Sequence, residues 1–336
     1  MTILYKVSVI IPTYRRCDSV KRVLQALSSQ TVPSDEYEVI ISIDGSEDGT
    51  REVVDTFKPD YTLRSIWSPN SGRASACNKG IREARGEIII LLDDDMEPTK
   101  NFIRAHYNAH IRGARVGVIG AAPIPINESS SFIVHYIAEK FNSHMNKIST
   151  PGYNFQIRDF YSGNFSIRRK LFLEVGLYNE AFKTYGNEDV ELASRFLKSG
   201  VKLAFNSEAL ALQYYEKDFS GVAIDNIDKG KTAVLLVSLH PETFNDLKLT
   251  KYNHESWKWR SIRAALIKLS ILFPKTKSLI ILFSSFIEKL HPTYLNTYYF
   301  LSLDYFFWLG VQTALKETTI SNRDNIIQHI NDYKKS

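Results

Sequence analysis

The feature that most constrains the fold is the apolar run Glu87–Leu92, which ends in Ile-Ile-Ile-Leu-Leu and leads directly into Asp93, Asp94 and Asp95. An unbroken apolar strand is typical of the centre of a parallel sheet, because helices cover both of its faces. In open α/β sheets, ligands bind at the carboxyl ends of the strands. The run therefore predicts an α/β fold with a ligand site where this strand ends.

Strands and helices alternate through the first half of the chain, which predicts a mostly parallel sheet flanked by helices. The other expected strands are Lys6–Ile11, Glu38–Ile43, Leu63–Trp67 and Val116–Ile119. A helix is expected over residues 188–199, ended by Gly200, and the chain from about residue 218 is mainly helical. We therefore expect one domain at 1–217 and a helical C-terminal region at 218–336.

The composition is that of an ordinary globular protein, with 44% hydrophobic and 24% charged residues among 336. This excludes a disordered chain and a polytopic membrane protein. The two cysteines, Cys17 and Cys77, give neither a disulfide framework nor metal-ligand spacing. The N-terminal segment is expected to be a first strand rather than a signal peptide, and the cytoplasm is the expected compartment.

Basic residues gather in the C-terminal region. Between residues 248 and 291 only Glu255 and Glu288 oppose Lys248, Lys251, Lys258, Arg260, Arg263, Lys268, Lys275, Lys277 and Lys289. No nucleic-acid-binding motif accompanies them, so an anionic membrane surface is the expected partner and nucleic acid is not. The apolar runs beside Pro274 are too short to span a bilayer, and Asp304 and Gln312 interrupt the longer one. Peripheral contact through 248–315 is therefore expected.

The three aspartates after the apolar run favour a metal site. Adjacent carboxylates repel one another unless a cation or hydrogen-bond donors compensate. Mg²⁺ and Mn²⁺ prefer oxygen ligands and commonly bind one or two carboxylates together with substrate phosphates. The alternative is a solvated acidic loop with a helix-capping aspartate.

Three further motifs bear groups suited to a nucleotide or to proton transfer. Asp44, in a turn after the second strand, can accept hydrogen bonds from a base or ribose, although a plain turn is the alternative. Arg73, near a helix N-terminus, suits a diphosphate, although it can equally be a surface arginine. Glu188 and Asp189 lie in the first turn of a helix, where the helix dipole alone favours acids.

Taken in order, these segments resemble the motifs of the family 2 glycosyltransferases, which have the GT-A fold. The matching segments are Val7–Tyr14, Asp44–Thr50, Asn70–Ile81, Leu92–Asp95, Gly163–Ile167 and Asn187–Asp189, within roughly residues 5–240. The resemblance implies an inverting, hexosyltransferase-like enzyme that moves a sugar from a nucleoside-diphosphate sugar to an acceptor hydroxyl, in polysaccharide, glycolipid or glycoconjugate synthesis. It implies Mn²⁺ or Mg²⁺ as cofactor, a UDP-sugar as donor, and a glycan or lipid-linked acceptor.

The resemblance also implies roles for single residues. Asp93 and Asp95 would hold the metal, and Asp189 would be the catalytic base, with Glu188 as the alternative. The nucleotide sugar would be bound by Pro12, Thr13, Tyr14, Arg16, Asp44, Gly72, Arg73, Asn78, Asp93, Asp94, Gly163 and Asn164. A nucleotide-binding half is expected at about 1–120 and an acceptor-side half at about 121–217.

Two positions depart from the family pattern. Ile43 stands where the family often has a second acid before the glycine, and Gln213 stands near the position of a histidine that can bind metal or diphosphate. Either metal affinity is weaker here or Glu216 substitutes. His106 and His110 match no catalytic motif and are expected to be structural.

Two other functions remain open from the sequence alone. A sugar-1-phosphate nucleotidyltransferase also uses a parallel sheet, a nucleotide and Mg²⁺, but it needs a Gly-rich basic loop where this chain has Pro12, Thr13 and Tyr14. A catalytically silent sugar-nucleotide-binding protein would be favoured by loss of Asp95 or Asp189, and both are present. A dinucleotide oxidoreductase is disfavoured because no G-x-G-x-x-G follows the first strand. The expected location is cytoplasmic, on the cytoplasmic face of a membrane.

Overall fold

The structure is a computed structural model that describes residues 4–111, 113–253, 255–290, 294–318 and 320–332. The chain forms two compact units. The first consists of residues 1–126, 138–183 and 188–215, and the second of residues 127–137, 184–187 and 216–336. The segments 127–137 and 184–187 therefore belong with the C-terminal helices, although they lie in the first half of the sequence or near its middle.

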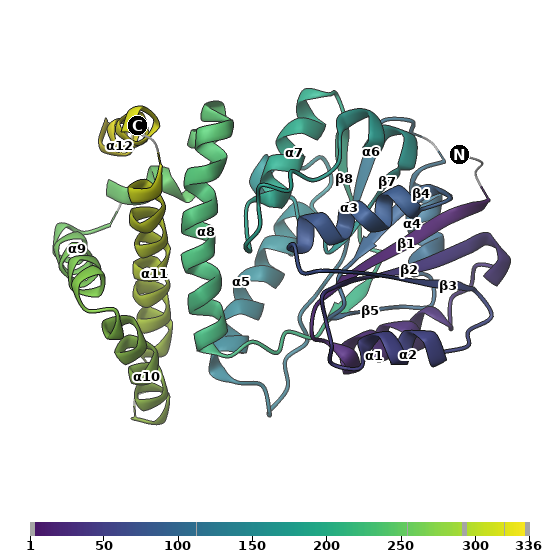
Figure 1. The fold of residues 1–336 in the computed structure, drawn as a ribbon, viewed down its shortest axis with the longest axis horizontal. Helices are drawn as coiled ribbons and strands as arrows, with labels where there is room; N and C mark the ends of the chain where they lie inside the picture. The colour runs from purple at the N-terminus through teal and green to yellow at the C-terminus, as the bar shows by residue number, and fades with distance from the viewer. Residues whose placement is uncertain (1–3, 112, 254, 291–293, 319, 333–336) are drawn as a thin grey trace. The chain divides into compact units, whose positions relative to one another are not determined.

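The first unit is built on a seven-stranded sheet with the order β3-β2-β1-β4-β7-β6-β8 (Figure 1). The strands are β1 Tyr5–Thr13, β2 Tyr37–Asp44, β3 Thr62–Ser68, β4 Gly86–Leu92, β6 Val116–Gly120, β7 Asn164–Arg168 and β8 Lys202–Asn206. β7 runs antiparallel to both of its neighbours, β4 and β6, and the remaining pairs are parallel. A second, two-stranded sheet pairs β5 Met96–Pro98 with β9 Ala211–Gln213. The mostly parallel sheet predicted from the sequence is confirmed.

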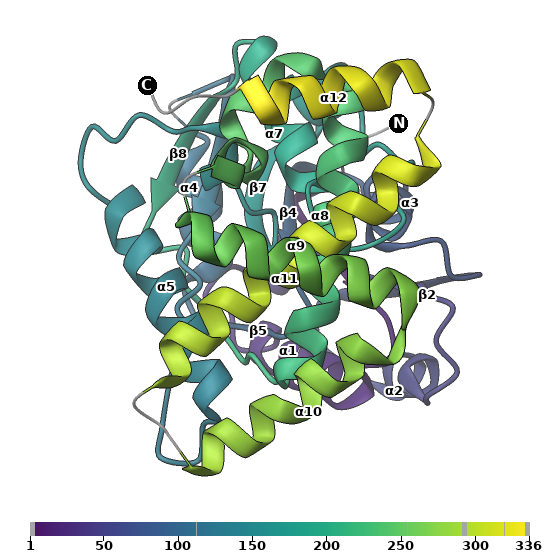
Figure 2. The same cartoon turned by 90° about the vertical axis from the view of Figure 1, so that its left-hand side faces the viewer.

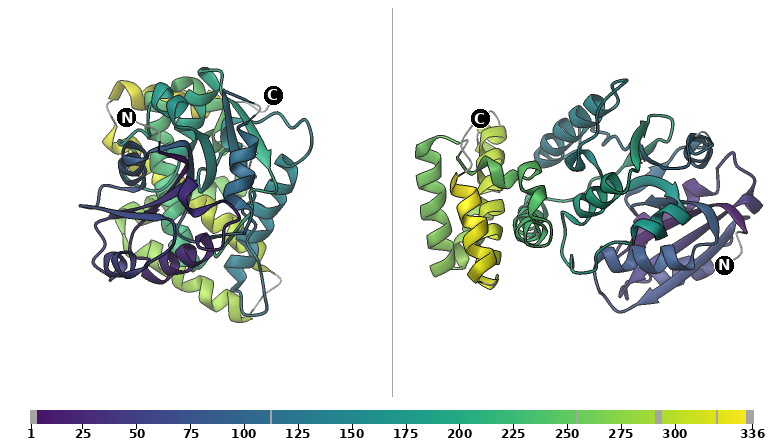
Figure 3. Two further views of the ribbon diagram at one scale, coloured as in Figure 1. Left: turned by 90° about the vertical axis from the view of Figure 1, so that its right-hand side faces the viewer. Right: turned by 90° about the horizontal axis from the view of Figure 1, so that it is seen from above.

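Helices cover both faces of the sheet, which explains the unbroken apolar run of β4 (Figures 1 and 3). Ile88, Ile90 and Leu92 lie in the core under α1, α2 and α4, whereas Ile89 and Leu91 lie in the core under α3, α6 and α7. Alternate side chains of a strand point to opposite faces, so a strand buried on both faces favours apolar residues at successive positions. The helices of the first unit are α1 Cys17–Leu27, α2 Thr50–Thr56, α3 Arg73–Glu83, α4 Phe102–Ala109, α6 Arg169–Val175 and α7 Glu188–Lys198, with 3-10 turns at Ser34–Glu36 and Ile157–Asp159.

The helix α5, Phe132–Ile148, contributes its start to the second unit and the rest to the first. The second unit otherwise contains α8 Phe219–Leu239, α9 Trp257–Leu272, α10 Lys275–Leu290, α11 Leu295–Glu317, α12 Ile320–Asp332 and 3-10 turns at Pro241–Asp246 and Lys248–Asn253. α11 packs along α8 and also contacts α9 and α10 (Figures 1 and 2). The helical C-terminal region is confirmed.

The long helix α11 carries a buried charge at Asp304, which is 4% exposed. Its carboxylate accepts hydrogen bonds from Arg263 at 2.6 Å and from the Trp259 indole at 3.0 Å, and Lys248 Nζ lies 3.2 Å away. A buried carboxylate with such partners avoids the large cost of an unpaired charge. None of the helices in the described part of the chain has the length and apolarity that a membrane-spanning segment requires.

Candidate active site

The candidate site of the first unit begins where β4 ends. The backbone N–H of Asp93 donates to the carbonyl of Gly163 at 2.8 Å, which joins the end of β4 to the residue before β7. The Asp93 carboxylate accepts two hydrogen bonds from Arg73, the first residue of α3, at 2.7 and 3.2 Å. Such a charge-assisted pair holds both side chains in one arrangement.

Arg73 also connects this strand end to α7. Its Nη1 donates to Ser162 Oγ at 3.1 Å and lies 3.5 Å from Asp189 and 4.0 Å from Glu188. Ser162 in turn donates to the Asp189 carboxylate from its backbone N–H at 3.1 Å and from its hydroxyl at 2.5 Å. Burial alone would lower the pKa of Arg73, but Asp93 and Asp189 outweigh it and raise that pKa, so the guanidinium stays charged.

Of the other two aspartates of the triplet, Asp94 is buried and Asp95 is partly buried. Burial raises the pKa of Asp94 to about 7 and that of Asp95 to about 6, and the charge of Asp93 adds to the shift at Asp95. The nearest cation is Arg16, 3.8 Å from Asp94 and 3.9 Å from Asp95. Gln213 Nε2 lies 3.5 Å from Asp95 Oδ2, but Asp95 Oδ1 is buried with no hydrogen-bond partner among the described residues.

These carboxylates fit a divalent cation. A buried carboxylate oxygen without a donor is costly, and a hard cation such as Mg²⁺ or Mn²⁺ offsets that cost. In the described part of the chain no group of three or more His, Cys, Asp or Glu side chains is arranged to hold a metal. The residues present therefore suit an ion that takes the rest of its ligands from phosphate oxygens and water, as Mg²⁺ commonly does.

Asp44 ties the end of β2 to the start of α3. Its two carboxylate oxygens accept the backbone N–H groups of Ser71 at 2.8 Å and Gly72 at 2.9 Å. The Asn70 side-chain amide donates to the Asp44 carbonyl at 3.2 Å. Both oxygens of this carboxylate thus already shape the loop that presents Arg73, and its contact with a base or ribose stays a prediction.

The remaining predicted ligands fall into two groups. Pro12 and Thr13 are the last two residues of β1, which lies next to β4 in the sheet. Tyr14 and Arg16 follow the end of β1, and Tyr14 is 43% exposed. Asn78 and Asn164 are buried and bond to the protein itself. The amide of Asn78 donates to the Tyr178 carbonyl, and that of Asn164 to the carbonyls of Ala121 and Ala209, each at 2.9 Å.

Two contacts of the site were not expected from the sequence. Ser162 bridges Arg73 and Asp189, and Gln213 approaches Asp95. The sequence marks Gln213 only as the residue that stands near the position of a family histidine. Ser162 precedes a matched motif by one residue, and that proximity is the one signal that could have identified it.

The profile described as Glycosyl transferase family 2 matches residues 8–176. The chain belongs to glycosyl transferase family 2. A second profile, the N-terminal domain of galactosyltransferase, matches residues 142–217. Membership in the family makes the chain a glycosyltransferase and favours neither a nucleotidyltransferase nor a silent binding protein.

The named relatives agree with this family, and solved structures share the fold. The chain is 25% identical over 267 residues to the uncharacterized glycosyltransferase YfnE of Bacillus subtilis, covering 66% of this chain and 68% of YfnE. It spans only 38% and 54% of the length of two further glycosyltransferases that it matches. The mannosyltransferase PcManGT from Pyrobaculum calidifontis, in complex with GDP-Man and Mn²⁺, has a TM-score of 0.56 at 18% identity, with 90% of this chain and 87% of that one covered. S. aureus TarS 1–349 with UDP-GlcNAc has a TM-score of 0.55 at 14% identity, with 94% and 93% covered.

Proposed function

We propose that the first unit transfers a sugar from a nucleoside-diphosphate sugar to an acceptor hydroxyl, with inversion at the anomeric carbon and with a divalent metal. The observation that carries this proposal is the meeting of Asp93, Ser162 and Asp189 around Arg73. A cation for a diphosphate and a carboxylate for a proton are the two groups that the transfer needs. Solved structures of similar fold contain GDP-Man with Mn²⁺, or UDP-GlcNAc, which supports this class of donor.

In this proposal Asp95 and Asp93 would hold Mn²⁺ or Mg²⁺, which would help to bind the donor diphosphate. The bound ion would neutralise charge on the departing nucleoside diphosphate. Arg16 and Arg73 add positive charge beside the same carboxylates, at 3.9 Å from Asp95 and 2.7 Å from Asp93. Arg73 is held by its carboxylate partners before any substrate arrives, so binding a phosphate requires little reorganisation of this side chain.

We assign Asp189 as the base that removes the proton of the acceptor hydroxyl. Its carboxylate is oriented by two hydrogen bonds from Ser162, and its side chain is 23% exposed, so a substrate can reach it. The Glu188 side chain is only 6% exposed. An accessible carboxylate held in one orientation is the better candidate for proton transfer.

The nucleobase of the sugar donor and the identity of the acceptor are proposed from the family resemblance, not from the geometry of the site. A UDP-sugar is the proposed donor, and a glycan or lipid-linked molecule is the proposed acceptor. The proposed domains are a catalytic domain at 1–217 and a helical region at 218–336. Residues 248–315 are proposed to contact the cytoplasmic face of a membrane, because exposed apolar side chains such as Leu272 and Leu282 accompany the lysines there.

A panel of nucleotide sugars tests the proposed donor. Ligands that bind only the folded protein raise its melting temperature, so each nucleotide sugar is scored with Mn²⁺ and with excess chelator. We expect one UDP-sugar to give the largest shift, and only with metal. Release of UDP from that donor, with and without candidate acceptors, then distinguishes the enzyme from a silent binding protein. Stabilisation by a nucleoside triphosphate plus a sugar 1-phosphate, with pyrophosphate release, would instead identify a nucleotidyltransferase.

A further inference from the structure

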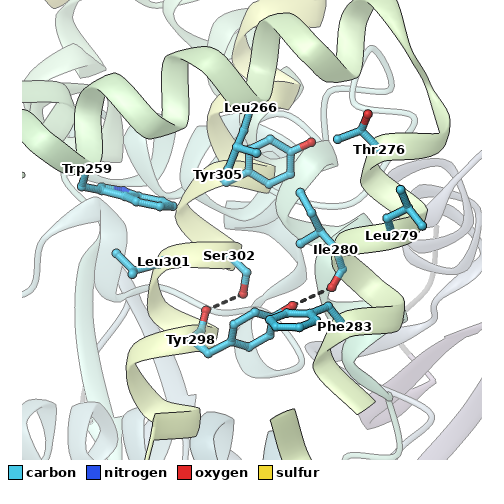
Figure 4. Close-up of a pocket in the computed structure, with 10 residues that line it drawn as sticks. All are labelled: Trp259, Leu266, Thr276, Leu279, Ile280, Phe283, Tyr298, Leu301, Ser302 and Tyr305. Atoms are coloured by element: carbon cyan, nitrogen blue, oxygen red, sulfur yellow. Dashed lines mark hydrogen bonds between the residues drawn. The ribbon is translucent and has the colours of Figure 1, made fainter. Parts of the chain in front are cut away.

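The second unit contains an apolar pocket of about 430 Å³ between α9, α10 and α11 (Figure 4). Trp259 and Leu266 reach it from α9, Leu279 and Phe283 from α10, and Tyr298 from α11. Its volume lies in the range of sites that hold small ligands, about 300–1,000 Å³. Leu279 is 64% exposed and Phe283 is 49% exposed, so the pocket reaches the protein surface.

Four side chains of the pocket wall, or their backbone neighbours, use their polar atoms in hydrogen bonds within the protein. The Tyr298 hydroxyl donates to the Ile280 carbonyl at 2.5 Å, and the Ser302 hydroxyl donates to the Tyr298 carbonyl at 2.6 Å (Figure 4). The Trp259 indole donates to Asp304 at 3.0 Å, and the Tyr305 hydroxyl is hydrogen-bonded to Ser270. A polar ligand would lose its water here without gaining these partners, so the pocket selects an apolar group.

A second hollow continues from this pocket along α10. It has a volume of about 590 Å³, shares Leu279 and Phe283 with the first, and adds Leu282, Phe286 and Lys289. An elongated apolar path that reaches a lysine suits a hydrocarbon chain with an anionic head group.

We propose that this pocket binds one hydrocarbon chain of an anionic membrane lipid. The inference rests on the proposed membrane contact, and it is independent of the sugar-transfer chemistry. It differs from adsorption on a surface because one chain enters a defined cavity between three helices. Each methylene group buried there adds to the affinity, and Lys289 selects a head group of negative charge.

Tryptophan quenching tests the proposal with the full chain, because Trp259 lines the pocket. The probe is lysophosphatidylglycerol with a brominated chain, used below its micelle concentration. We expect saturable quenching at one lipid per protein. Leu279→Asp puts a charge at the mouth and should weaken binding about tenfold or more. The matched control is Leu272→Asp, since Leu272 is 72% exposed on α9 and does not line the pocket.

Three other outcomes would each overturn the proposal. Equal weakening by the two aspartate substitutions would mean adsorption on an apolar surface. Absence of quenching would mean that no chain enters, and a dimer that Leu279→Asp dissociates would identify a second copy of the chain as the occupant. Both substitutions replace exposed side chains, and circular dichroism checks their folding. The melting temperature of Leu279→Asp is also measured with the nucleotide sugar. If the nucleotide sugar raises it as much as in the parent protein, the variant has lost the lipid site but not the proposed transferase function.

Discussion

Asp93 and Asp95 lie two residues apart at the end of β4 but have different surroundings. Asp93 is paired with Arg73 at 2.7 Å, whereas Asp95 keeps one buried oxygen without a hydrogen-bond partner among the described residues. Asp93 therefore already has a compensating charge, and Asp95 is the carboxylate that gains more from a bound cation. The proposed metal dependence should therefore respond most strongly to a change at Asp95.

Replacing Asp95 by asparagine should remove the stabilisation that Mn²⁺ adds in the presence of UDP. An amide keeps the shape of the side chain but lacks the negative charge that a hard cation prefers. The measurement is the melting temperature with UDP, with and without Mn²⁺. Asp60→Asn, at an exposed aspartate of the same unit, is the control and should behave as the parent protein. An intact metal response in Asp95→Asn would place the ligand elsewhere.

Replacing Asp189 by asparagine should lower the rate of transfer by about 10²–10⁴-fold, because a general base contributes on that order. Affinity for the nucleotide sugar should stay nearly unchanged, and Glu188→Gln should have a milder effect. Ser162→Ala removes the 2.5 Å hydrogen bond to Asp189 and should reduce turnover without abolishing it. Turnover is measured as transfer to a verified acceptor. Near-normal turnover in Asp189→Asn, with loss in Glu188→Gln, would assign the base to Glu188.

The sequence predicts which acidic residues belong to the candidate site, but it does not predict their hydrogen-bond partners. Asp93, Asp94 and Asp95 are identified by the apolar strand before them. The contact of Arg73 with Ser162 joins residues 89 positions apart, and no local pattern encodes it. Asn164 shows the reverse case, because its motif predicts a ligand contact whereas its side chain bonds to carbonyls of the protein interior.

At the scale of elements, α8 and α11 approach so closely that each has a glycine at the contact. A Cβ added to Gly230 would lie 2.0 Å from the Phe307 carbonyl oxygen, and one added to Gly310 would lie 1.9 Å from the Ile227 carbonyl oxygen. Real Cβ atoms do not come this close to backbone, so an alanine at either position must push the two helices apart.

Gly230→Ala or Gly310→Ala should therefore destabilise the second unit by about 1–3 kcal/mol, the usual cost of overpacking. A glycine-to-alanine substitution within a helix normally stabilises the protein by up to about 1 kcal/mol. A loss of stability in these two variants would therefore indicate the close contact between the helices. Gly221→Ala is the control in the same helix, because its Cβ would meet other atoms only at 3.5 Å or more. Urea unfolding followed by circular dichroism measures the difference. Stabilisation by all three substitutions would show that the contact is looser than described.

Helix α4 and strand β7 are joined by a buried hydrogen-bond chain that makes stability depend on pH. Ser166 Oγ lies 2.8 Å from a ring nitrogen of both His106 and His110, and Asn164 accepts from the other nitrogen of His106 at 2.8 Å. Burial lowers the pKa of His106 to about 3 and that of His110 to about 4. Both rings are therefore neutral in the folded protein at ordinary pH.

The free energy of unfolding should fall as the pH drops below about 6.5, because the unfolded histidines then take up protons that the folded ones refuse. For each pH unit below that value, each histidine lowers the free energy of unfolding by up to about 1.4 kcal/mol, until the pH reaches the pKa of that histidine in the folded protein. The measurement is urea unfolding between pH 7 and pH 5. His106→Gln should reduce the slope, whereas His329→Gln, at an exposed histidine of α12, should not. An unaltered slope in His106→Gln would mean that this ring is not held neutral.

The predicted strands agree with the structure to within one or two residues, because buried strands of a parallel sheet have long apolar runs. The antiparallel direction of β7 was not predicted. A strand's own residues do not encode the direction of its neighbours, and β7 follows a long excursion through α5 instead of a short crossover. β5 and β9 are three residues each, which is too short to show a periodic pattern.

For the molecule as a whole, the C-terminal helices decide whether the protein works at a membrane. α9 and α10 expose large apolar side chains, among them Trp257, Leu272, Leu279 and Leu282, between lysines and arginines. Monomeric proteins seldom leave such apolar surface open, so a partner for these helices is expected. An anionic bilayer offers both an apolar interior and negative charge.

Co-sedimentation with phosphatidylglycerol vesicles should therefore detect binding that weakens with salt, because the Debye length falls from about 8 Å at physiological ionic strength to about 3 Å at 1 M. Each lysine near an anionic surface contributes about 1 kcal/mol, so the double substitution Lys275→Gln and Lys277→Gln should weaken binding about thirtyfold. The control is Lys58→Gln, at an exposed lysine of the first unit. If neither salt nor the lysine substitutions weaken binding, the protein binds the membrane through its apolar side chains alone. No binding at all would mean that these helices pack against a protein instead of a membrane.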